Sequence, residues 1–257
     1  MLPGDRLAFR IGAEQVGWVL PDVAAVLAGL ADIRRDETGV TLEAAERLPA
    51  IGRAMSDHGL CRWRDEAFDV RVDPDGPVLA QVDRGCLVAL GMMSQGIHMD
   101  GVVRAPDGLH IWIAKRSASK ALDPGKLDHL VAGGVPAGLS PWQTLLKEAA
   151  EEAALPAALA EHARDVGRFA YAMERPEGLR RDVLHCYEVE LPADWVPHAL
   201  DGEVESFSLM PLDAVVAAVR EGAAFKFNVG PVLIRLFLRH GAIAGTEAVE
   251  LRQALEG

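Results

Sequence analysis

The order of β-rich and helical segments predicts an α+β fold with a mixed sheet. Two observations carry this prediction. Runs of alternating or β-branched residues are interspersed with amphipathic helices along the chain, and turn clusters such as Ala105-Pro106-Asp107-Gly108 join neighbouring runs. The 257 residues suffice for one large domain or two modest ones. We place a boundary near Met93, with a small α/β domain over 1–92 and a larger domain over 93–257.

The N-terminal segment is expected to form the small α/β domain. Residues 6–20 indicate two short strands around a glycine-containing turn, and a helix should begin at Pro21, which suits the first helical position. Thr41 precedes a stretch, 42–60, with helical periodicity that Pro49 interrupts. Residues 62–72 alternate like one strand, and 73–77 (DPDGP) form a turn cluster.

The second segment begins with a hairpin, 96–103 and 109–116, around the Pro-Asp-Gly turn. A further strand is expected over 127–134, and a helix should follow Ser140. The later expected elements, in chain order, are strands over 166–175, 182–191 and 202–211, helices over 212–222 and 228–241, and a helical tail after Gly245.

Bulk properties exclude several classes of protein. No apolar run reaches the length of a membrane span, and the N-terminus has no basic and apolar secretory signal. The three widely spaced cysteines (Cys61, Cys86 and Cys186) fit free thiols in a reducing cytoplasm. A net charge of −12 argues against a nucleic-acid partner. We therefore expect a cytoplasmic protein without membrane or nucleic-acid partners.

Three glutamates crowd one face of the helix after Ser140. Ser140, with proline next and Gln143 three residues on, matches a capping box. At about 100° per residue, Glu148, Glu151 and Glu152 share one face, where like charges destabilise a bare helix. A solvated acidic surface is the plain interpretation. The glycine-rich turn ahead of the helix (GGVPAG) instead favours a ligand that the backbone approaches closely, with Mg²⁺ or Mn²⁺ between the carboxylates and phosphate.

This turn and helix resemble the Nudix box, G-x5-E-x7-R-E-U-x-E-E-x-G-U, where U is a bulky aliphatic residue. Gly133, the three glutamates and Leu155 match it. Four positions depart from the pattern: Leu139 at the early glutamate, Lys147 at the arginine, Ala149 at U and Ala154 at the late glycine. From about Glu14 to about Ile243, the chain is similar to the Nudix subfamily related to fungal thiamine pyrophosphokinase proteins. A small preceding domain and a box with similar departures are usual in that subfamily.

The resemblance implies an α/β/α Nudix sandwich and a diphosphate hydrolase. Glu148, Glu151, Glu152 and the backbone of Gly133 would hold the metal, and Lys147 would steady a box glutamate. A base outside the box is usual in the family, and Glu205 or Glu203 is the candidate. Glu151 is a further catalytic candidate. The subfamily cleaves thiamine diphosphate-like compounds, favouring oxidised forms, to the monophosphate.

Substrate contacts are expected from several cationic or aromatic positions, each with a plainer alternative. Trp63 between two arginines offers a stacking face beside phosphate-binding cations. The remaining candidates are a strand histidine, two residues at a strand end and the residue before the last apolar helix. The full set is Arg62, Trp63, Arg64, His98, Lys115, Arg116 and Asn228. A buried Trp63, solvated cations, a plain strand histidine and a capping Asn228 are the alternatives.

Two other functions stay open on the sequence alone. A generic Nudix pyrophosphatase would act on ADP-ribose, a dinucleotide or a coenzyme A-like molecule with the same metal helix. A Nudix fold can also bind a ligand without catalysis, although that usually follows loss of box glutamates, which this chain keeps. A homodimer is expected only because Nudix proteins often pair.

Overall fold

The computed structural model describes residues 4–120, 122–200 and 202–256. By its internal packing the chain divides into two compact units. The N-terminal unit comprises Met1–Gln95, Gly134–Ser140 and Ala170–Val183, and the C-terminal unit comprises Gly96–Gly133, Pro141–Phe169 and Leu184–Gly257. Among the described helices, none combines the length and apolar character needed to cross a bilayer.

The N-terminal unit is built on a four-stranded sheet in the order β2-β1-β4-β3. Its first two strands form the expected hairpin around Gly12, whose φ of 57° is left-handed and suits glycine. A separate two-stranded sheet pairs β5 with β6. The elements are β1 (Leu7–Ile11), β2 (Glu14–Val19), α1 (Pro21–Leu27), β3 (Ile33–Arg35), β4 (Gly39–Leu42), η1 (Ala45–Arg47), α2 (Leu48–Asp57), β5 (Ala67–Val70), β6 (Ala80–Asp83) and η2 (Arg84–Cys86).

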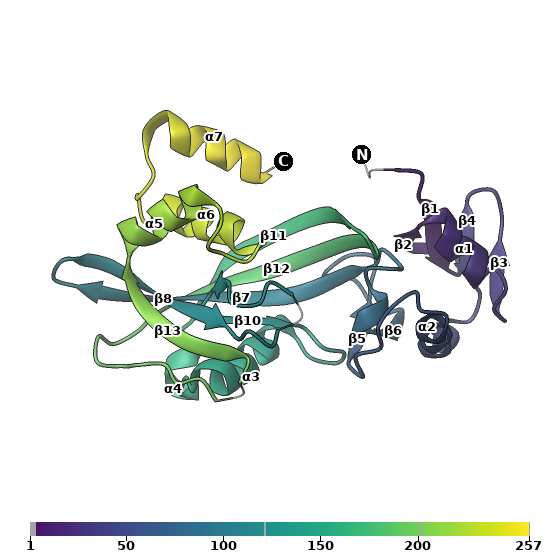
Figure 1. Ribbon diagram of the computed structural model, residues 1–257, viewed down its shortest axis with the longest axis horizontal. Coiled ribbons are helices and arrows are strands. Elements are labelled where there is room, and N and C mark those ends of the chain that lie inside the picture. Colours follow the sequence, from purple (N-terminus) through teal and green to yellow (C-terminus); the bar gives the residue numbers. More distant parts are fainter. Residues whose placement is uncertain (1–3, 121, 201, 257) are drawn as a thin grey trace. The chain divides into compact units, whose positions relative to one another are not determined.

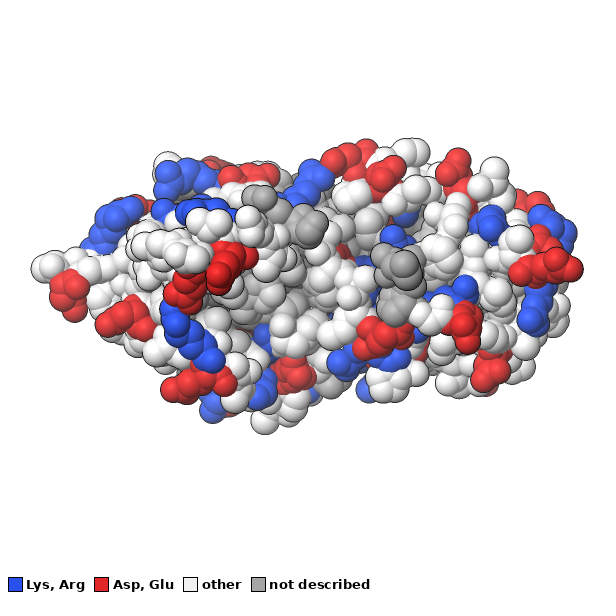
Figure 2. All heavy atoms as spheres, turned by 90° about the horizontal axis from the view of Figure 1, so that it is seen from above, with Lys and Arg blue, Asp and Glu red and all other residues white. Residues whose placement is uncertain are grey.

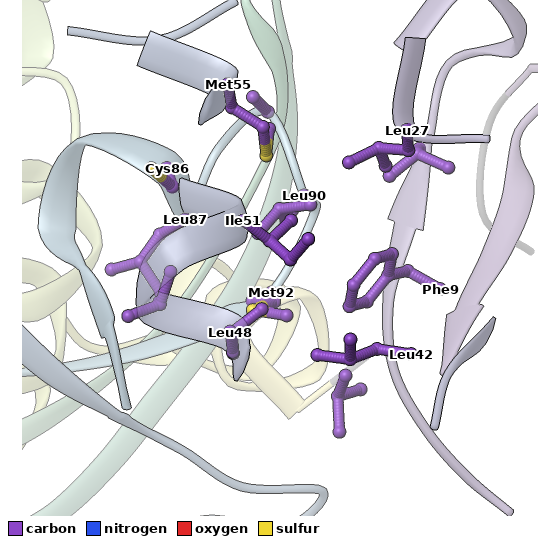
Figure 3. Close-up of a cluster of buried hydrophobic side chains, with 14 of the residues drawn as sticks. Phe9, Leu27, Leu42, Leu48, Ile51, Met55, Cys86, Leu87, Leu90 and Met92 are labelled. Carbon is purple, nitrogen blue, oxygen red and sulfur yellow. The ribbon is translucent and has the colours of Figure 1, made fainter. Parts of the chain in front are cut away.

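The core of this unit lies where α2 meets the first sheet. Figure 3 shows Leu48, Ile51 and Met55 of α2 gathered with Phe9 and Leu42. Phe9, Leu42, Leu48 and Met55 are fully buried. Since each buried side chain of this size contributes about 1.5–3 kcal/mol, the cluster is the main source of stability for the unit.

Three local predictions in the chain are corrected. Thr41 does not precede a helix but lies in β4, where it pairs with Arg10 of β1. Helix α2 begins at Leu48 and has Pro49 in its first turn, where the missing N–H costs nothing. The strand expected over 62–72 is confined to β5. The strand expected over 127–134 is two strands, because β9 pairs with β8 while β10 pairs with β7.

The seven-stranded sheet has the main order β11-β12-β7-β8-β13 and lies mostly in the C-terminal unit, while residues 170–183 of the β11–β12 hairpin are grouped with the N-terminal unit. The expected hairpin of β7 and β8 is antiparallel, with Gly101 opposite Trp112. In Figure 1, α3 and α4 cover one face of the sheet while α5 and α6 cover the other, which gives the expected α/β/α layering. The elements are β7 (Met93–Ala105), β8 (Gly108–Arg116), β9 (Leu127–Asp128), β10 (Val131–Gly134), α3 (Pro141–Ala153), α4 (Ala157–Ala160), β11 (Arg164–Arg175), β12 (Gly178–Glu190), β13 (Val204–Pro211), α5 (Leu212–Glu221), α6 (Val229–Arg239) and α7 (Gly245–Glu256).

Helix α6 is fixed to the sheet by an apolar face and by one buried carboxylate. Leu233 and Leu236 are fully buried against β7 and β8 in one cluster. Glu188 on β12, whose side chain is 5% exposed, accepts from Arg239 at 2.8 Å and contacts His240 at 3.0 Å. Burial would raise the pKa of Glu188, but these two hydrogen bonds outweigh it and lower that pKa.

Charges of both signs are interspersed on the molecular surface. On the face drawn in Figure 2, Lys and Arg side chains lie beside Asp and Glu side chains rather than forming a single basic field. Several exposed pairs, such as Arg34 with Glu43 and Arg220 with Glu247, lie at salt-bridge distance. Exposed pairs of this kind contribute about 1 kcal/mol or less each, so they add little to the stability of the fold.

Candidate active site

Gly133, the first residue of the glycine turn, and the acidic helix lie side by side in the C-terminal unit. Strand β10 ends at Gly134, and α3 follows from Pro141 with Leu145, Ala149 and Ala153 fully buried on its inner face. After α3, Ala154 has a φ of 54°, a left-handed conformation that favours glycine. The apolar residues of α3 thus form its buried inner face, and the three glutamates follow this face in order of exposure, with Glu152 buried, Glu148 partly exposed and Glu151 half exposed.

Glu148 lies directly against the glycine turn. A Cβ atom placed on Gly133 would come within 2.8 Å of Glu148 Cγ and 2.9 Å of Glu148 Cδ. Such distances are shorter than side-chain contacts allow, so a larger residue at 133 would force the Glu148 carboxyl group away from the backbone. The Glu148 side chain is 17% exposed and therefore keeps access to solvent.

Glu152 links the helix to strand β10 from a buried position. Its Oε2 accepts the backbone N–H of Ala132 at 2.9 Å, and the residue is only 6% exposed. Burial, together with the nearby carboxylates of Glu148 and Asp128, raises the pKa of Glu152 to about 8, although the Ala132 hydrogen bond opposes this. A cation beside Glu152 would relieve the cost of ionising it.

Lys147 bridges two of the three glutamates. Its Nζ lies 2.6 Å from Glu151 Oε2 and 3.1 Å from Glu148 Oε1. These hydrogen bonds, first that to Glu151, raise the pKa of Lys147. Lys147 and Glu151 are about half exposed, with side-chain exposures of 45% and 50%. The ammonium therefore reduces the repulsion between Glu148 and Glu151 on the solvent side of α3.

A pocket opens beside Glu152 between α3 and the sheet. It brings Glu152 together with Arg116 and Glu203, which the sequence had singled out, and with other residues that it had not. The lining residues are Ala114, Arg116, Asp128, His129, Ala132, Glu152, Glu203 and Val204. A cation and carboxylates thus converge on one small cavity, which is typical of a site for a charged ligand.

Arg116 is held in place at the pocket by three acceptors. Its guanidinium donates to Asp128 Oδ2 at 2.8 Å and to the carbonyl oxygens of Leu122 and Asp123. Lys226 contacts the same Asp128 oxygen at 3.3 Å. Burial would raise the pKa of Asp128, but Lys226 and the other cationic groups around it keep that pKa well below its usual range. Asp128 is therefore a charged anchor that positions Arg116.

The two acidic candidates near β13 lie in different surroundings. Glu203 lines the pocket and is paired with Lys120. Glu205 does not line the pocket and pairs with Lys115 at 2.7 Å, and the side chains of Glu203 and Glu205 are both about half exposed. Lys115, expected to bind substrate, thus lies in a surface ion pair with Glu205.

His98 is buried at 3% exposure and contacts His129 edge to face, with ring centroids 4.6 Å apart. Burial, and then His129, lower the pKa of His98, so its imidazole is neutral. His129 Nδ1 in turn contacts Asp100 Oδ1 at 2.6 Å. Of these three residues, His129 lines the pocket, and His98 and Asp100 contact it. Asp100 and His129 were not expected from the sequence, since no local motif marks them.

Among the described residues, one group of metal-type ligands lies outside α3. One ligand atom from each of His98, Asp128 and His129 lies within 4.8 Å of the others. However, Arg116 and Lys226 already neutralise Asp128, and they would repel a further cation. The oxygen donors of α3 and the glycine turn suit a hard divalent ion better.

The remaining predicted contacts lie on other elements. In the N-terminal unit, Arg62 and Arg64 are exposed, and the guanidinium of Arg53 lies 4.9 Å from the centre of the Trp63 ring. In the C-terminal unit, Asn228 is 6% exposed and occupies the N-cap position of α6, but its side chain makes no capping bond there. The plain capping role is thus not what this side chain performs.

Comparisons with known proteins agree with this geometry. The NUDIX domain model matches residues 96–231. The chain is 42% identical over 192 residues to Nudix hydrolase 20, chloroplastic, of Arabidopsis thaliana, covering 74% of this chain and 51% of that protein. It is 41% identical over 180 residues to Nudix hydrolase 24, chloroplastic, of the same plant, covering 70% and 49%. The chain therefore spans about half the length of the curated relatives it matches.

Among solved structures, DR0079 from Deinococcus radiodurans has the same fold. The TM-score is 0.52 at 22% sequence identity, and the match covers 66% of this chain and 98% of that one.

Proposed function

Because the chain belongs to the Nudix family, we propose that it is a metal-dependent hydrolase that cleaves a small-molecule diphosphate by attack of water on phosphorus. One observation carries this proposal. Glu148 and Glu152 of α3 converge on the backbone of residues 132–133, beside a pocket that contains the fixed cation Arg116. Acidic oxygens and a guanidinium in one cavity suit a metal-bound phosphate.

The residues present fit a divalent ion, which we propose to be Mg²⁺ or Mn²⁺. Glu148, Glu151, Glu152 and the carbonyl oxygen of Gly133 would hold it. The fit rests on the close approach at Gly133 and on the raised pKa of buried Glu152, whose ionisation needs a nearby positive charge. When bound, such an ion neutralises phosphoryl charge and lowers the pKa of a bound water.

The protein's own side chains position the reacting groups. Lys147 donates hydrogen bonds to Glu148 and Glu151 and so restricts the rotation of both carboxylates. The orientation of the Arg116 guanidinium is fixed by Asp128. A base must reach the attacking water. Glu203 fits this role better than Glu205 because only Glu203 lines the pocket, although each glutamate is half exposed and paired with a lysine, Glu203 with Lys120 and Glu205 with Lys115. Glu151, exposed beside Glu148, is the second candidate.

For the substrate, we propose an oxidised thiamine diphosphate-like compound that is cleaved to its monophosphate. The support is the resemblance of the turn, the helix and the N-terminal segment to the thiamine-related Nudix subfamily. Trp63 would stack on the heterocycle, which requires displacement of the Arg53 guanidinium from its ring. His98 and Asn228 are buried, so they would act by supporting the site rather than by direct contact.

A panel of diphosphates with Mg²⁺ and product identification tests both levels of this proposal. We expect hydrolysis of oxothiamine diphosphate to the monophosphate, and a loss of at least about a hundredfold in Glu152→Gln. Glu161→Gln, at an exposed glutamate, is the matched control and should retain activity. Preference for ADP-ribose, a dinucleotide or coenzyme A would remove the substrate proposal and keep the hydrolase.

An absence of hydrolysis with every diphosphate, or hydrolysis that survives excess EDTA, would contradict the proposal of a metal-dependent hydrolase. Either result would favour a Nudix protein that only binds ligands.

The remaining organisation is also proposed. We assign 1–92 to a small domain and 93–257 to the Nudix domain, with Arg62 and Arg64 contributing to substrate binding. Charge-neutral changes at these arginines should raise KM, and unchanged KM and kcat would remove this role. A homodimer and a cytoplasmic location stay predictions, while the two plant relatives carry the word chloroplastic in their names.

A further inference from the structure

Two cysteines that lie far apart in the sequence are in contact within the N-terminal unit. The Sγ atoms of Cys61 and Cys86 are 3.1 Å apart, although 25 positions separate the residues. Cys61 follows α2 and is partly exposed, whereas Cys86 ends η2 and is fully buried. Both thiols lie over the carbonyl oxygen of Gly52 in α2, at 4.0 and 3.5 Å.

The backbone around the two thiols is built for this close approach. A Cβ atom on Gly85, which precedes Cys86, would lie 1.8 Å from the carbonyl oxygen of Arg62, which follows Cys61. Only glycine permits backbones to approach so closely. The carboxylate of Asp83 ties the same segments together, because it accepts the N–H groups of Arg64 at 2.9 Å and Gly85 at 2.8 Å.

The glycine of α2 leaves room for the sulfur atoms. A Cβ atom on Gly52 would lie 3.2 Å from Cys86 Sγ and 3.4 Å from a methyl group of Val82. A larger side chain there would push the Cys86 thiol away. Both thiols are thus held in place by their surroundings, and a bond between them requires an approach of only about 1 Å.

We propose that Cys61 and Cys86 form a redox-active dithiol, which a hydroperoxide oxidises to an intramolecular disulfide. The Cys61 sulfur attacks the terminal oxygen of the hydroperoxide. An S–O bond forms, the O–O bond breaks and the alcohol leaves with a proton, so Cys61 becomes a sulfenic acid. The Cys86 sulfur then attacks Cys61 Sγ, the S–S bond forms, and the S–O bond breaks with release of water. Two thiols thus reduce one hydroperoxide by two electrons.

The order of the two attacks follows from exposure and charge. Cys61 reaches solvent and Cys86 does not. The hydrogen bond from the Cys86 thiol lowers the pKa of Cys61, and the same contact, with burial, raises that of Cys86. Cys186 is the natural contrast, since it is buried on β12, where burial raises the pKa of its thiol to about 12.

Hydrogen peroxide treatment of the full-length protein tests this inference. The intact mass should fall by ~2 Da, and the thiol count under denaturing conditions should fall from three to one. A crosslinked peptide should join Cys61 to Cys86, and dithiothreitol should restore both thiols. The Cys186→Ser variant should still lose ~2 Da, whereas the Cys61→Ser variant should not.

Two results would overturn the proposal. One is oxygen addition at Cys61 while the Cys86 thiol of the same folded protein stays free. The other is three intact thiols after peroxide has oxidised a small dithiol in the same tube. Both results are measured on the wild-type protein, so they do not depend on whether the Cys61→Ser variant folds.

Discussion

The buried carboxyl of Glu152 should make magnesium binding depend steeply on pH. Burial, with the neighbouring Glu148 and Asp128, raises the pKa of Glu152 to about 8, so the side chain of the metal-free protein holds its proton at neutral pH. A divalent ion must displace that proton, because carboxylate ligands bind metal in the ionised form. The perturbation is therefore Mg²⁺ added at a series of pH values.

The magnitude follows from the fraction of ionised Glu152. With a folded-state pKa of about 8, only about 1% is ionised at pH 6 and about half at pH 8. The apparent affinity for Mg²⁺ should therefore rise about fiftyfold between these values and level off above them. If the pKa lies one unit lower, the rise is still about tenfold. In Glu152→Gln this rise should disappear.

The same proton affects stability without metal. Since the folded-state pKa lies above the ordinary value of 4.5, the folded protein binds this proton more tightly than the unfolded chain does. Its contribution to stability is complete below about pH 4.5 and is lost as pH rises through about 8. Mg²⁺ should thus raise the melting temperature more at pH 8 than at pH 6.

Isothermal titration calorimetry in buffers of different ionisation enthalpy measures both the affinity and the proton released. We expect nearly one proton released per ion at pH 6.5 in the wild type, and a smaller number in Glu152→Gln. The Glu161→Gln variant, altered at an exposed glutamate, should match the wild type. An affinity that does not change between pH 6 and pH 8 would show that Glu152 is not a metal ligand, or that it is ionised already.

Four substitutions test other parts of the structure. Gly133→Ala places a Cβ atom 2.8 Å from the Glu148 side chain and should lower kcat about a hundredfold without unfolding, as circular dichroism would check. Ala154→Gly should stabilise by up to about 1 kcal/mol in urea unfolding, because φ there is 54°. Glu188→Gln should lower the free energy of unfolding by about 1–2 kcal/mol. Because the pKa of Glu188 is lowered in the folded protein, the wild type should lose this contribution on acidification, whereas the variant should not show that loss. Leu236→Ala, in the fully buried core, should cost about 3 kcal/mol.

Elements with strong local signals could be predicted from the sequence. The hairpin of β7 and β8 has a Pro-Asp-Gly turn between two β-rich runs, and α3 has an apolar period that packs Leu145 and Ala149 inward. In contrast, the sequence of 127–134 predicts one strand, but the segment forms two. The segment is divided because β9 pairs with β8 while β10 pairs with β7, and a local sequence pattern carries no information about these partner strands. Thr41 was misplaced for the same reason, since β1 decides its conformation.

The acidic helix of the candidate site has a local signal, because the spacing of Glu148, Glu151 and Glu152 predicts that they share one helical face. In the structure Glu152 is buried while Glu151 is half exposed, so a joint role as metal ligands stays a prediction. The network of Arg116, Asp128 and Lys226 spans more than a hundred positions, and of its three members only Arg116 was expected from the sequence. The contact of Cys61 with Cys86 is likewise a product of tertiary packing, so the widely spaced cysteines gave no sign of it.

The departures from the box motif show how a fold tolerates substitution at positions that local geometry constrains. The motif has glycine where Ala154 lies, and the backbone there is indeed left-handed, so alanine adopts a conformation that costs about 1 kcal/mol. At the arginine position, Lys147 still reaches both Glu148 and Glu151, but through a single ammonium nitrogen rather than a planar fork. One departure therefore affects stability and the other the rigidity of the carboxylates. Gly133, which no other residue can replace without displacing Glu148, matches the motif, because its constraint acts directly on a proposed ligand.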